Sequence, residues 1–220
     1  MGAFRDAYYN ILTNQSSTEI LVLTISSKLS GTFNAALTAA TQIPQARIFV
    51  FDTLSAAMGV GLMVMAAAKM VALEASLNEV IDRMEQMRQE LAIFLVVDTL
   101  EYLKRGGRIG AATAFLGTLL DTKPILTIMD GEIKPLDRVR TKKKAVKRLF
   151  YELEQRLPAT GRPVQAGVMH VAAPGEAEEL GQMIKENFNL THFFNLELGP
   201  VIGAHVGPGT LGAGLCPEPG

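Results

Sequence analysis

The sequence TISSKLSGT, residues 24–32, decides the fold. Residues 19–25 are apolar and β-branched, which predicts a strand covered on both faces, and a helical pattern begins near Phe33. Hydroxyl groups therefore gather where a strand ends and a helix starts. Unpaired backbone N–H groups and a partial positive charge at a helix N-terminus suit a carboxylate or a phosphate. An ordinary N-cap beside a polar turn is the alternative interpretation.

Two further buried strands are expected downstream, at residues 47–51 and 92–97. Helical segments separate them, among them the almost entirely apolar stretch 54–73 and an amphipathic helix after it. Strands that alternate with helices favour a parallel α/β sheet, whose ligands lie beyond the carboxyl ends of the strands. In that sheet the residues brought to one edge would be Ser26-Ser27, Asp52-Thr53 and Asp98-Thr99.

The pattern changes in the second half of the chain. Asp130-Gly131 lies between two short apolar runs and predicts a β-hairpin, and Pro135 marks the second arm as an edge strand. A helix is expected at residues 141–157, and strands at 164–171 and 192–198 flank another helix. We therefore predict an α/β fold of two lobes, a parallel α/β lobe at residues 1–104 and an α+β lobe at residues 105–220.

Composition and charge are those of an ordinary globular protein. Hydrophobic residues make up 48% of the chain, and the net charge of −1 gives no general attraction to nucleic acid or to an anionic membrane. The one cysteine, Cys216, excludes an internal disulfide. The N-terminus shows no signal-peptide pattern, so we expect a cytoplasmic protein. Although residues 54–73 approach the length of a spanning helix, Lys69 and many small residues favour a buried helix without stable membrane insertion.

A glycine-rich stretch at residues 199–212 carries His205 in its middle. Glycines let a backbone pass close to a ligand, and an imidazole can donate a hydrogen bond to a carboxylate. A structural histidine bonded to a carbonyl is the alternative. The glycine spacing also matches a dinucleotide fingerprint, but a proline lies inside it and too little chain follows for a βαβ unit.

Signatures of catalysis and of metal binding are missing from the sequence. It contains no phosphate-binding loop, no Gly-x-Ser-x-Gly elbow and no His/Cys/carboxylate set at metal spacing, so we predict no catalytic residue, no metal site and no cofactor. One enzymatic alternative stays open, an acyl hydrolase or transferase in which Ser30 is the nucleophile and His205 the base. Asp52 or Asp98 would then have to orient the imidazole.

Basic residues are dense between Arg138 and Arg148. A charged, solvated helix face is the ordinary explanation. Interleaved aromatic residues for stacking on bases are absent, which argues against nucleic acid. An acidic protein or a lipid phosphate is the better functional candidate, and we predict Arg108, Arg140 and Lys143 as docking residues for a partner.

Taken together, seven motifs in this order resemble the DegV family of bacterial fatty-acid-binding proteins. They span nearly the whole chain, and although each is weak alone, the set is specific. The motifs are ISSKLSGT (25–32), DTLSAAMG (52–59), LEYLKRGGRI (100–109), KPIL (123–126), DGEI (130–133), RTKKKA (140–145) and GPVIGAH (199–205).

The resemblance implies a specific function. In that family two α/β lobes enclose a long-chain fatty acid in an apolar tunnel, and a separate fatty acid kinase can receive the acid and make acyl-phosphate. It implies that Ser30, in the Ser-Gly-Thr motif, bonds the carboxylate. It also implies that the C-terminal glycine-rich loop returns to this site, with His205 close by. We therefore predict a non-enzymatic lipid-binding protein whose site residues are Ser27, Ser30, Gly31, Thr32 and His205.

The chain departs from the family pattern at both ends. Members open with a strand ending in an Asp-Ser-Thr-like turn and later carry a Thr-Ser-Gln-Pro motif, whose threonine also touches the carboxylate. Neither is found here, so we expect a member truncated at its N-terminus, whose first lobe lacks a strand, a helix and one carboxylate ligand. Residues 214–220 also differ from the usual closing strand.

Overall fold

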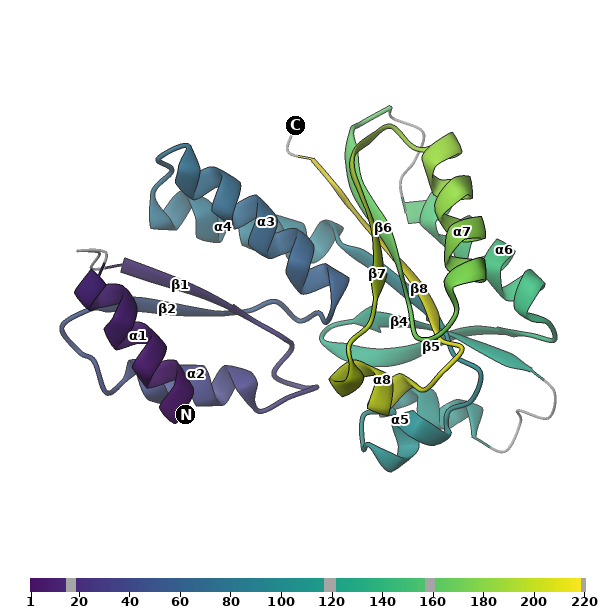
Figure 1. Cartoon of the computed structure of the whole chain (residues 1–220), viewed down its shortest axis with the longest axis horizontal. Helices are drawn as coiled ribbons and strands as arrows, with labels where there is room; N and C mark the ends of the chain where they lie inside the picture. The colour runs from purple at the N-terminus through teal and green to yellow at the C-terminus, as the bar shows by residue number, and fades with distance from the viewer. Residues whose placement is uncertain (15–18, 117–121, 157–160, 219–220) are drawn as a thin grey trace.

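The computed structural model describes residues 1–14, 19–116, 122–156 and 161–218, which form two lobes arranged side by side (Figure 1). Each lobe is built around its own β-sheet. The elements of the first lobe are α1 (Gly2–Asn14), β1 (Glu19–Thr24), α2 (Thr32–Ala40), β2 (Arg47–Asp52), α3 (Met58–Ala72) and α4 (Leu77–Glu90). The second lobe begins with β3 (Ala92–Val96) and contains the remaining elements.

In the first lobe, β1 and β2 pair in parallel, with Glu19 opposite Arg47 and Thr24 opposite Asp52. Figure 1 shows α1 and α2 on one side of this pair and α3 and α4 on the other. Each side has its own apolar cluster, one centred on Tyr8 and Ile43 and the other rich in methionine. This arrangement confirms the predicted alternation of parallel strands and helices.

The prediction that these strands are buried on both faces is wrong. Of the twelve residues of β1 and β2, only three are buried, and Phe49 is 41% exposed. The described part of this sheet holds two strands, so each strand has an open edge and the helices cover the faces incompletely.

The expected third strand of this sheet belongs to the other lobe. β3 pairs antiparallel with β4 and β8, so Asp98-Thr99 does not share an edge with Ser26-Ser27. Every residue of β3 is buried, and an uninterrupted apolar run carries no information about which strands it pairs with. The division of the chain at residue 104 stays a prediction, although sheet pairing assigns β3 to the second lobe.

The second lobe contains a six-stranded mixed sheet in the order β5-β4-β3-β8-β6-β7. Helices α6 and α7 cover one face, where Leu149 of α6 packs in one apolar cluster with Phe94 and Val96 of β3. The opposite face of this sheet packs against α3 and α4 of the first lobe. Helices α5 and α8 lie near one end of the sheet (Figure 1). The elements after β3 are α5 (Glu101–Arg105), a 3-10 helix η1 (Gly110–Phe115), β4 (Lys123–Met129), β5 (Glu132–Val139), α6 (Lys142–Arg156), β6 (Val164–His170), α7 (Pro174–Asn187), β7 (Leu190–Glu197), α8 (Pro200–Val206) and β8 (Leu211–Pro217).

The predicted hairpin is confirmed. β4 and β5 pair antiparallel around Asp130 and Gly131, both of which have positive φ, at 54° and 79°. This is the conformation that Asp-Gly favours in a two-residue turn. β5 is an edge strand and holds Pro135, as expected. The predicted helix at 141–157 is α6, whose last predicted residue, Leu157, lies outside the described residues.

The glycine-rich stretch differs from the expected loop. Residues Pro200–Val206 form the short helix α8, which ends at Gly207 with φ 81°. The tail then forms β8, a fully buried strand in the middle of the sheet, so the expectation that it departs from a closing strand is wrong. Glycines are required there, because a Cβ at Gly214 would lie 2.5 Å from Ile93 Cδ1.

The apolar stretch 54–73 contains a helix, as predicted, but α3 is buried on one side only. Leu62 and Met63 are buried, whereas Val64 and Val71 are 44% and 61% exposed. Within the described ranges, no helix is both long enough and apolar enough to cross a bilayer.

Candidate functional site

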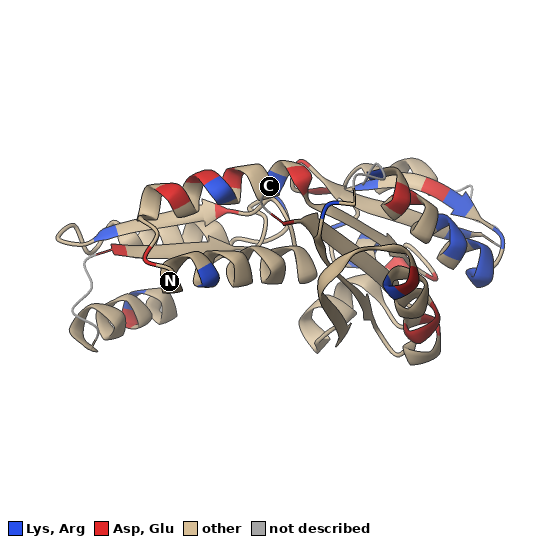
Figure 2. Ribbon diagram, turned by 90° about the horizontal axis from the view of Figure 1, so that it is seen from above, with Lys and Arg blue, Asp and Glu red and all other residues tan. Residues whose placement is uncertain are grey.

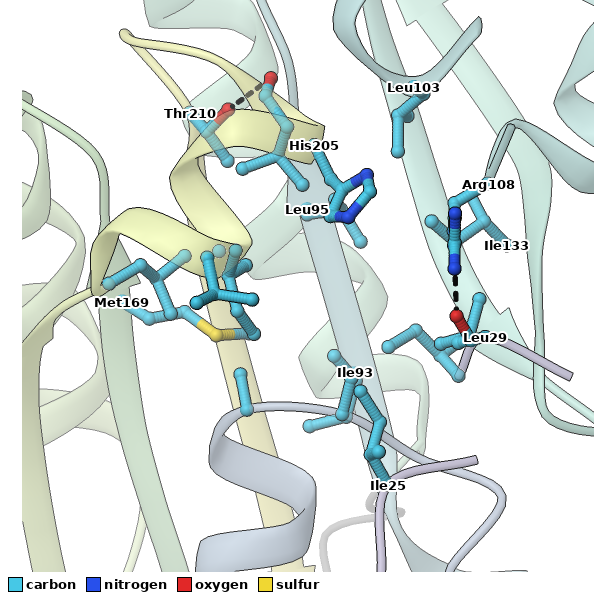
Figure 3. Close-up of a pocket in the computed structure, with 18 of the residues that line it drawn as sticks. Ile25, Leu29, Ile93, Leu95, Leu103, Arg108, Ile133, Met169, His205 and Thr210 are labelled. Carbon is cyan, nitrogen blue, oxygen red and sulfur yellow. Dashed lines mark hydrogen bonds between the residues drawn. The ribbon is translucent and has the colours of Figure 1, made fainter. Parts of the chain in front are cut away.

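An apolar cavity of about 160 Å³ lies between the lobes (Figure 3). The first lobe contributes the segment after β1, with Ile25 and Leu29, and the start of α3. The second lobe contributes one face of its sheet together with α8. Few polar residues line the cavity, and they are Ser30, Arg108, His205 and Thr210.

Strand alternation explains why β3 forms the wall. Side chains of a strand point to opposite faces in turn. Ile93 and Leu95 therefore face the cavity (Figure 3), while Phe94 and Val96 pack in the core beneath α6.

Ser30 lies where the sequence predicted, just before α2. Its Oγ is 2.8 Å from the Thr32 hydroxyl and accepts a hydrogen bond from the Thr32 backbone N–H at 3.3 Å. The residue is half-buried and lines the cavity. A hydroxyl at this place can donate to an anion while the helix terminus adds a favourable field.

The other predicted residues of this motif do not line the cavity. Ser27 donates its backbone N–H to the Asp52 carboxylate at 3.2 Å, and Thr32 contacts Ser30. Gly31 is exposed at the start of α2.

Ser26 has a role that sequence reasoning missed. It is fully buried, and its hydroxyl donates to the Gly131 carbonyl at 2.7 Å, from the first lobe to the hairpin of the second. A Cβ at Gly131 would lie 2.6 Å from this Oγ, so glycine is needed for the close approach as well as for the turn. Lys28 adds an ion pair with Glu132 across the same boundary.

His205 lies on α8 with its ring toward the cavity (Figure 3). Its Nδ1 is buried and has no hydrogen-bond partner within the described part of the chain. A buried nitrogen without a partner is costly unless a ligand supplies one. This nitrogen faces Gly106, however, so the ring can meet a bound molecule only through its opposite edge.

Two motifs that are about 100 residues apart pack into each other around His205. A Cβ at Gly106 would lie 2.2 Å from His205 Nδ1, and a Cβ at Gly207 would lie 2.3 Å from the Tyr102 ring. Each glycine thus leaves room for an aromatic ring from the other motif. The glycines of residues 100–109 and 199–212 position the histidine.

Arg108 lines the cavity, whereas the sequence grouped it with the docking surface. Its Nε donates to the Leu29 carbonyl at 2.9 Å, and its Nη1 donates to the Gly106 carbonyl at 2.7 Å. These bonds fix the guanidinium at the exposed end of the cavity. Within the described part of the chain Nη2 makes no hydrogen bond, so it can donate to a ligand. Because this arginine bridges the lobes, it places a positive charge beside Ser30.

Thr210 is the second residue that sequence reasoning missed. It is fully buried and lines the cavity, but its hydroxyl is 3.0 Å from the Val206 carbonyl and 2.8 Å from the Gly207 carbonyl. The hydroxyl is thus engaged at the end of α8.

Neither candidate acid orients the imidazole. Asp52 accepts bonds from the N–H groups of Ser27 and Leu54. Burial alone would raise the pKa of Asp98, but hydrogen bonds and charges of Lys123 and Lys142 outweigh it and hold that pKa below its ordinary value. A Ser–His–acid arrangement is therefore not formed by the residues that sequence reasoning nominated.

Arg140 and Lys143 lie apart from the cavity, on an exposed basic surface around α6 (Figure 2). No group of three or more His, Cys, Asp or Glu side chains suited to a metal ion occurs among the residues the structure describes.

The fold and site together define a two-lobed α/β binding protein. Its chamber is apolar, and Ser30, Arg108 and His205 supply hydrogen-bond donors and positive charge. Such a chamber suits an amphipathic molecule with an anionic head.

The chain belongs to the DegV family, because the family model, described as an uncharacterised protein family, matches residues 1–218. A DegV domain-containing protein of Streptomyces coelicolor is 39% identical over 205 residues, which are 93% of this chain and 72% of that protein. Protein DegV of Bacillus subtilis is 34% identical, over 90% of this chain and 70% of its own length.

Solved structures agree with this assignment. A fatty-acid-binding DegV family protein from Thermus thermophilus superposes with a TM-score of 0.92 at 36% identity, covering 98% of this chain and 76% of that one. The fatty-acid-binding protein DegV from Bacillus subtilis gives 0.89 at 30% identity, with 99% and 76% covered.

Proposed function

We propose that this protein binds a long-chain fatty acid between its lobes. The carboxylate lies at Ser30, with His205 and Arg108 as further donors, and the acyl chain occupies the apolar cavity. The observation that carries the proposal is that Ser30, Arg108 and His205 are gathered on one cavity whose lining is otherwise almost wholly apolar. The fatty-acid-binding relatives of the same fold support it.

The acyl chain and the carboxylate contribute differently to the free energy of binding. Each buried methylene contributes roughly 0.8 kcal/mol, so a long chain supplies most of the affinity. A hydrogen bond to a charged group contributes about 1.5–3 kcal/mol, which fixes the orientation of the acid more than its affinity.

Native mass spectrometry of the purified protein tests the proposal. We expect a mass increment of a fatty acid in the purified protein, or after loading with hexadecanoic acid. A folded protein that neither carries nor accepts a fatty acid would refute the proposal.

The site supports binding without catalysis better than it supports an enzyme. Ser30 bonds Thr32, and the carboxylates of Asp52 and Asp98 are held by other groups. The alternative, an acyl hydrolase or transferase using Ser30 and His205, keeps one observation in its favour, since both residues line the same cavity. Ester turnover that disappears in Ser30→Ala would favour the enzyme, and no turnover in the wild type would favour binding alone.

We further propose that the protein acts in the cytoplasm and presents its fatty acid to a fatty acid kinase. The exposed cations around α6, among them Arg140 and Lys143, provide a surface for an acidic partner (Figure 2). Charge reversal of Lys143 and Lys147 should weaken the complex with such a kinase, measured by calorimetry. Charge reversal of exposed Lys185 on α7 is the control, and unchanged affinity in the double variant would remove this surface from the interface.

A further inference from the structure

A second cavity, of about 140 Å³, lies away from the proposed lipid site. Helices α3 and α4 form one wall, and β6 with the end of β8 forms the other. The C-terminal end of β8 is the end of the sheet opposite α5 and α8 (Figure 1). Lys69 and Leu73 line the cavity and are exposed, so it opens to solvent beside them and a small molecule can enter.

The side chain of Met58 separates this cavity from the proposed lipid site. Along β6, Met169, Gly167 and Gln165 point to the same face of the sheet. Met169 lines the first cavity and Gln165 lines the second. Met58 packs on Gly167 between them, since a Cβ there would lie 2.9 Å from Met58 Cε, and Met58 Sδ would lie 3.2 Å from a Cβ at Gly214, the partner of Gly167 on β8.

Gln165 supplies the second cavity with an unused hydrogen-bond acceptor. Its side-chain amide nitrogen donates to Glu218 Oε1 at 2.9 Å. Because an ionised carboxylate only accepts hydrogen bonds, this contact fixes which way the amide points. Gln165 is 6% exposed, and its Oε1 has no partner within the described residues.

Arg83 supplies an unused donor to the same cavity. Its Nη1 pairs with Glu90 at 3.2 Å, and its Nη2 donates to the Pro217 carbonyl at 2.9 Å. The side chain is 8% exposed, and its Nε makes no hydrogen bond in the part of the chain that the structure describes. A buried donor and a buried acceptor that both lack partners are costly, so a ligand that serves both is favoured.

The surroundings of these two atoms define the chemistry of such a ligand. An anion would meet Gln165 Oε1 and the nearby Glu218 carboxylate, and a cation would meet Arg83 and Lys69, so an uncharged molecule fits best. A hydroxyl is the most compact uncharged group that both accepts and donates.

The remaining wall is apolar and suits a hydrocarbon body. Ala66, Met70 and Met87 contribute to it, and methionine side chains adapt readily to the shape of a ligand. A cavity of about 150 Å³ holds one benzene molecule, so the second cavity has the size for a single small ring.

We propose that the second cavity is a binding site for a small uncharged alcohol or phenol. Its hydroxyl accepts a hydrogen bond from Arg83 and donates one to Gln165, and its ring lies against Met70 and Met87. This site is additional to the proposed lipid site and does not depend on it.

The test compares phenol with toluene, which has the same shape but lacks the hydroxyl. Both are titrated into protein labelled at its methionine methyl groups, and NMR shifts locate the bound molecule. We expect phenol to shift Met70 and Met87 and to leave Met169 in the first cavity unchanged. Phenol should also bind at least roughly tenfold more tightly than toluene, because only phenol satisfies the two buried atoms.

Gln165→Met removes the acceptor and keeps the length of the side chain. We expect it to weaken phenol binding roughly tenfold or more and to leave toluene within about threefold of the wild type. Gln182→Met, at an exposed position of α7, is the matched control and should change neither affinity. Circular dichroism establishes that the variants are folded, and Arg83→Lys, which keeps the charge and removes Nε, provides a second test if Gln165→Met does not fold.

Three outcomes would overturn the proposal. These are Met70 and Met87 signals that do not move at about 10 mM phenol, equal affinities for phenol and toluene, and equal effects of Gln165→Met on both. The titrations are repeated after loading with hexadecanoic acid, and an acid that excludes phenol would show that the second cavity is occupied by the acyl chain. A protein that binds phenol as expected but no fatty acid would refute the proposed function alone.

Discussion

At the scale of single residues, Ser30 and His205 lie at opposite ends of the sequence and meet at one cavity. The sequence predicted both, because a hydroxyl at a strand-to-helix junction and a histidine among glycines are local signals. Arg108 and Thr210 also line the cavity, but local sequence gave no such signal for them. An arginine after two glycines resembles a solvated helix end, and only the packing of the lobes brings it to Leu29.

Ser30→Ala removes the proposed hydrogen-bond donor to the carboxylate. We expect fatty-acid affinity to fall by about 1.5–3 kcal/mol, the value of a hydrogen bond to a charged group. Thr38→Ala is the matched control, because Thr38 lies on the same helix and its hydroxyl bonds the Asn34 carbonyl away from the cavity. Equal affinities of Ser30→Ala and the wild type by calorimetry would exclude Ser30 from the site.

The ionisation of Asp98 makes the free energy of unfolding depend on pH. Its folded-state pKa lies below the ordinary 3.8, because Lys123 and Lys142 together outweigh the effect of burial. A carboxyl with a lowered pKa contributes stability above its unfolded pKa and loses it as pH falls through the folded one. Asp98→Asn should therefore lower the melting temperature at pH 7 and differ less from the wild type below pH 4.

The control for this effect is Asp82→Asn, at an exposed position of α4. A destabilisation by Asp98→Asn that is the same at pH 7 and pH 3 would show that the lost charge is not its cause.

At the scale of secondary-structure elements, α5 and α8 hold the site through two glycines, each facing a ring of the other helix. The short helix α8 presents His205 to the cavity, and Gly106 at the end of α5 makes room for the imidazole. This packing explains why glycines stand in both motifs.

Gly106→Ala should weaken fatty-acid binding by displacing the His205 ring, since the new Cβ would lie 2.2 Å from its Nδ1. Affinity and the NMR signals of the imidazole are the measurements. Gly61→Ala in α3 is the control, because nothing lies within 4 Å of a Cβ there and alanine favours a helix. Unchanged His205 signals in Gly106→Ala would contradict the positioning role.

Elements with strong local signals were predictable from the sequence. The Asp-Gly turn gave the β4–β5 hairpin, and the apolar stripe of α6 gave its buried face. Sheet membership was not predictable, because the apolar run of β3 looks the same in either sheet. β8 was missed for another reason, since its glycines argue against a strand until close neighbours such as Ile93 are known.

At the scale of the whole molecule, a few polar contacts join the lobes beside the cavity. Ser26 donates to Gly131, Arg108 donates to Leu29, and Lys28 pairs with Glu132. A ligand that contacts both lobes adds to these contacts, so binding and stability should be linked.

The labelling rate of the Cys216 thiol measures this linkage between ligand binding and stability. Cys216 is 1% exposed in β8, and burial raises its pKa to about 12, so the thiol stays protonated and unreactive at pH 8. Labelling with a thiol reagent should therefore require the sheet to open. Fatty acid at about 100 times its dissociation constant should slow labelling roughly 100-fold if opening abolishes binding. A rate that the acid does not change would show that opening at Cys216 is independent of the site.

A crystal structure with an ω-brominated fatty acid tests the central claim most directly, because the anomalous signal of bromine distinguishes the two ends of the ligand. The account predicts a carboxylate within about 3.2 Å of Ser30 Oγ. It also predicts the bromine among the apolar residues that line the cavity, away from Ser30. Bromine beside Ser30, or an acid bound anywhere other than between the lobes, would contradict it.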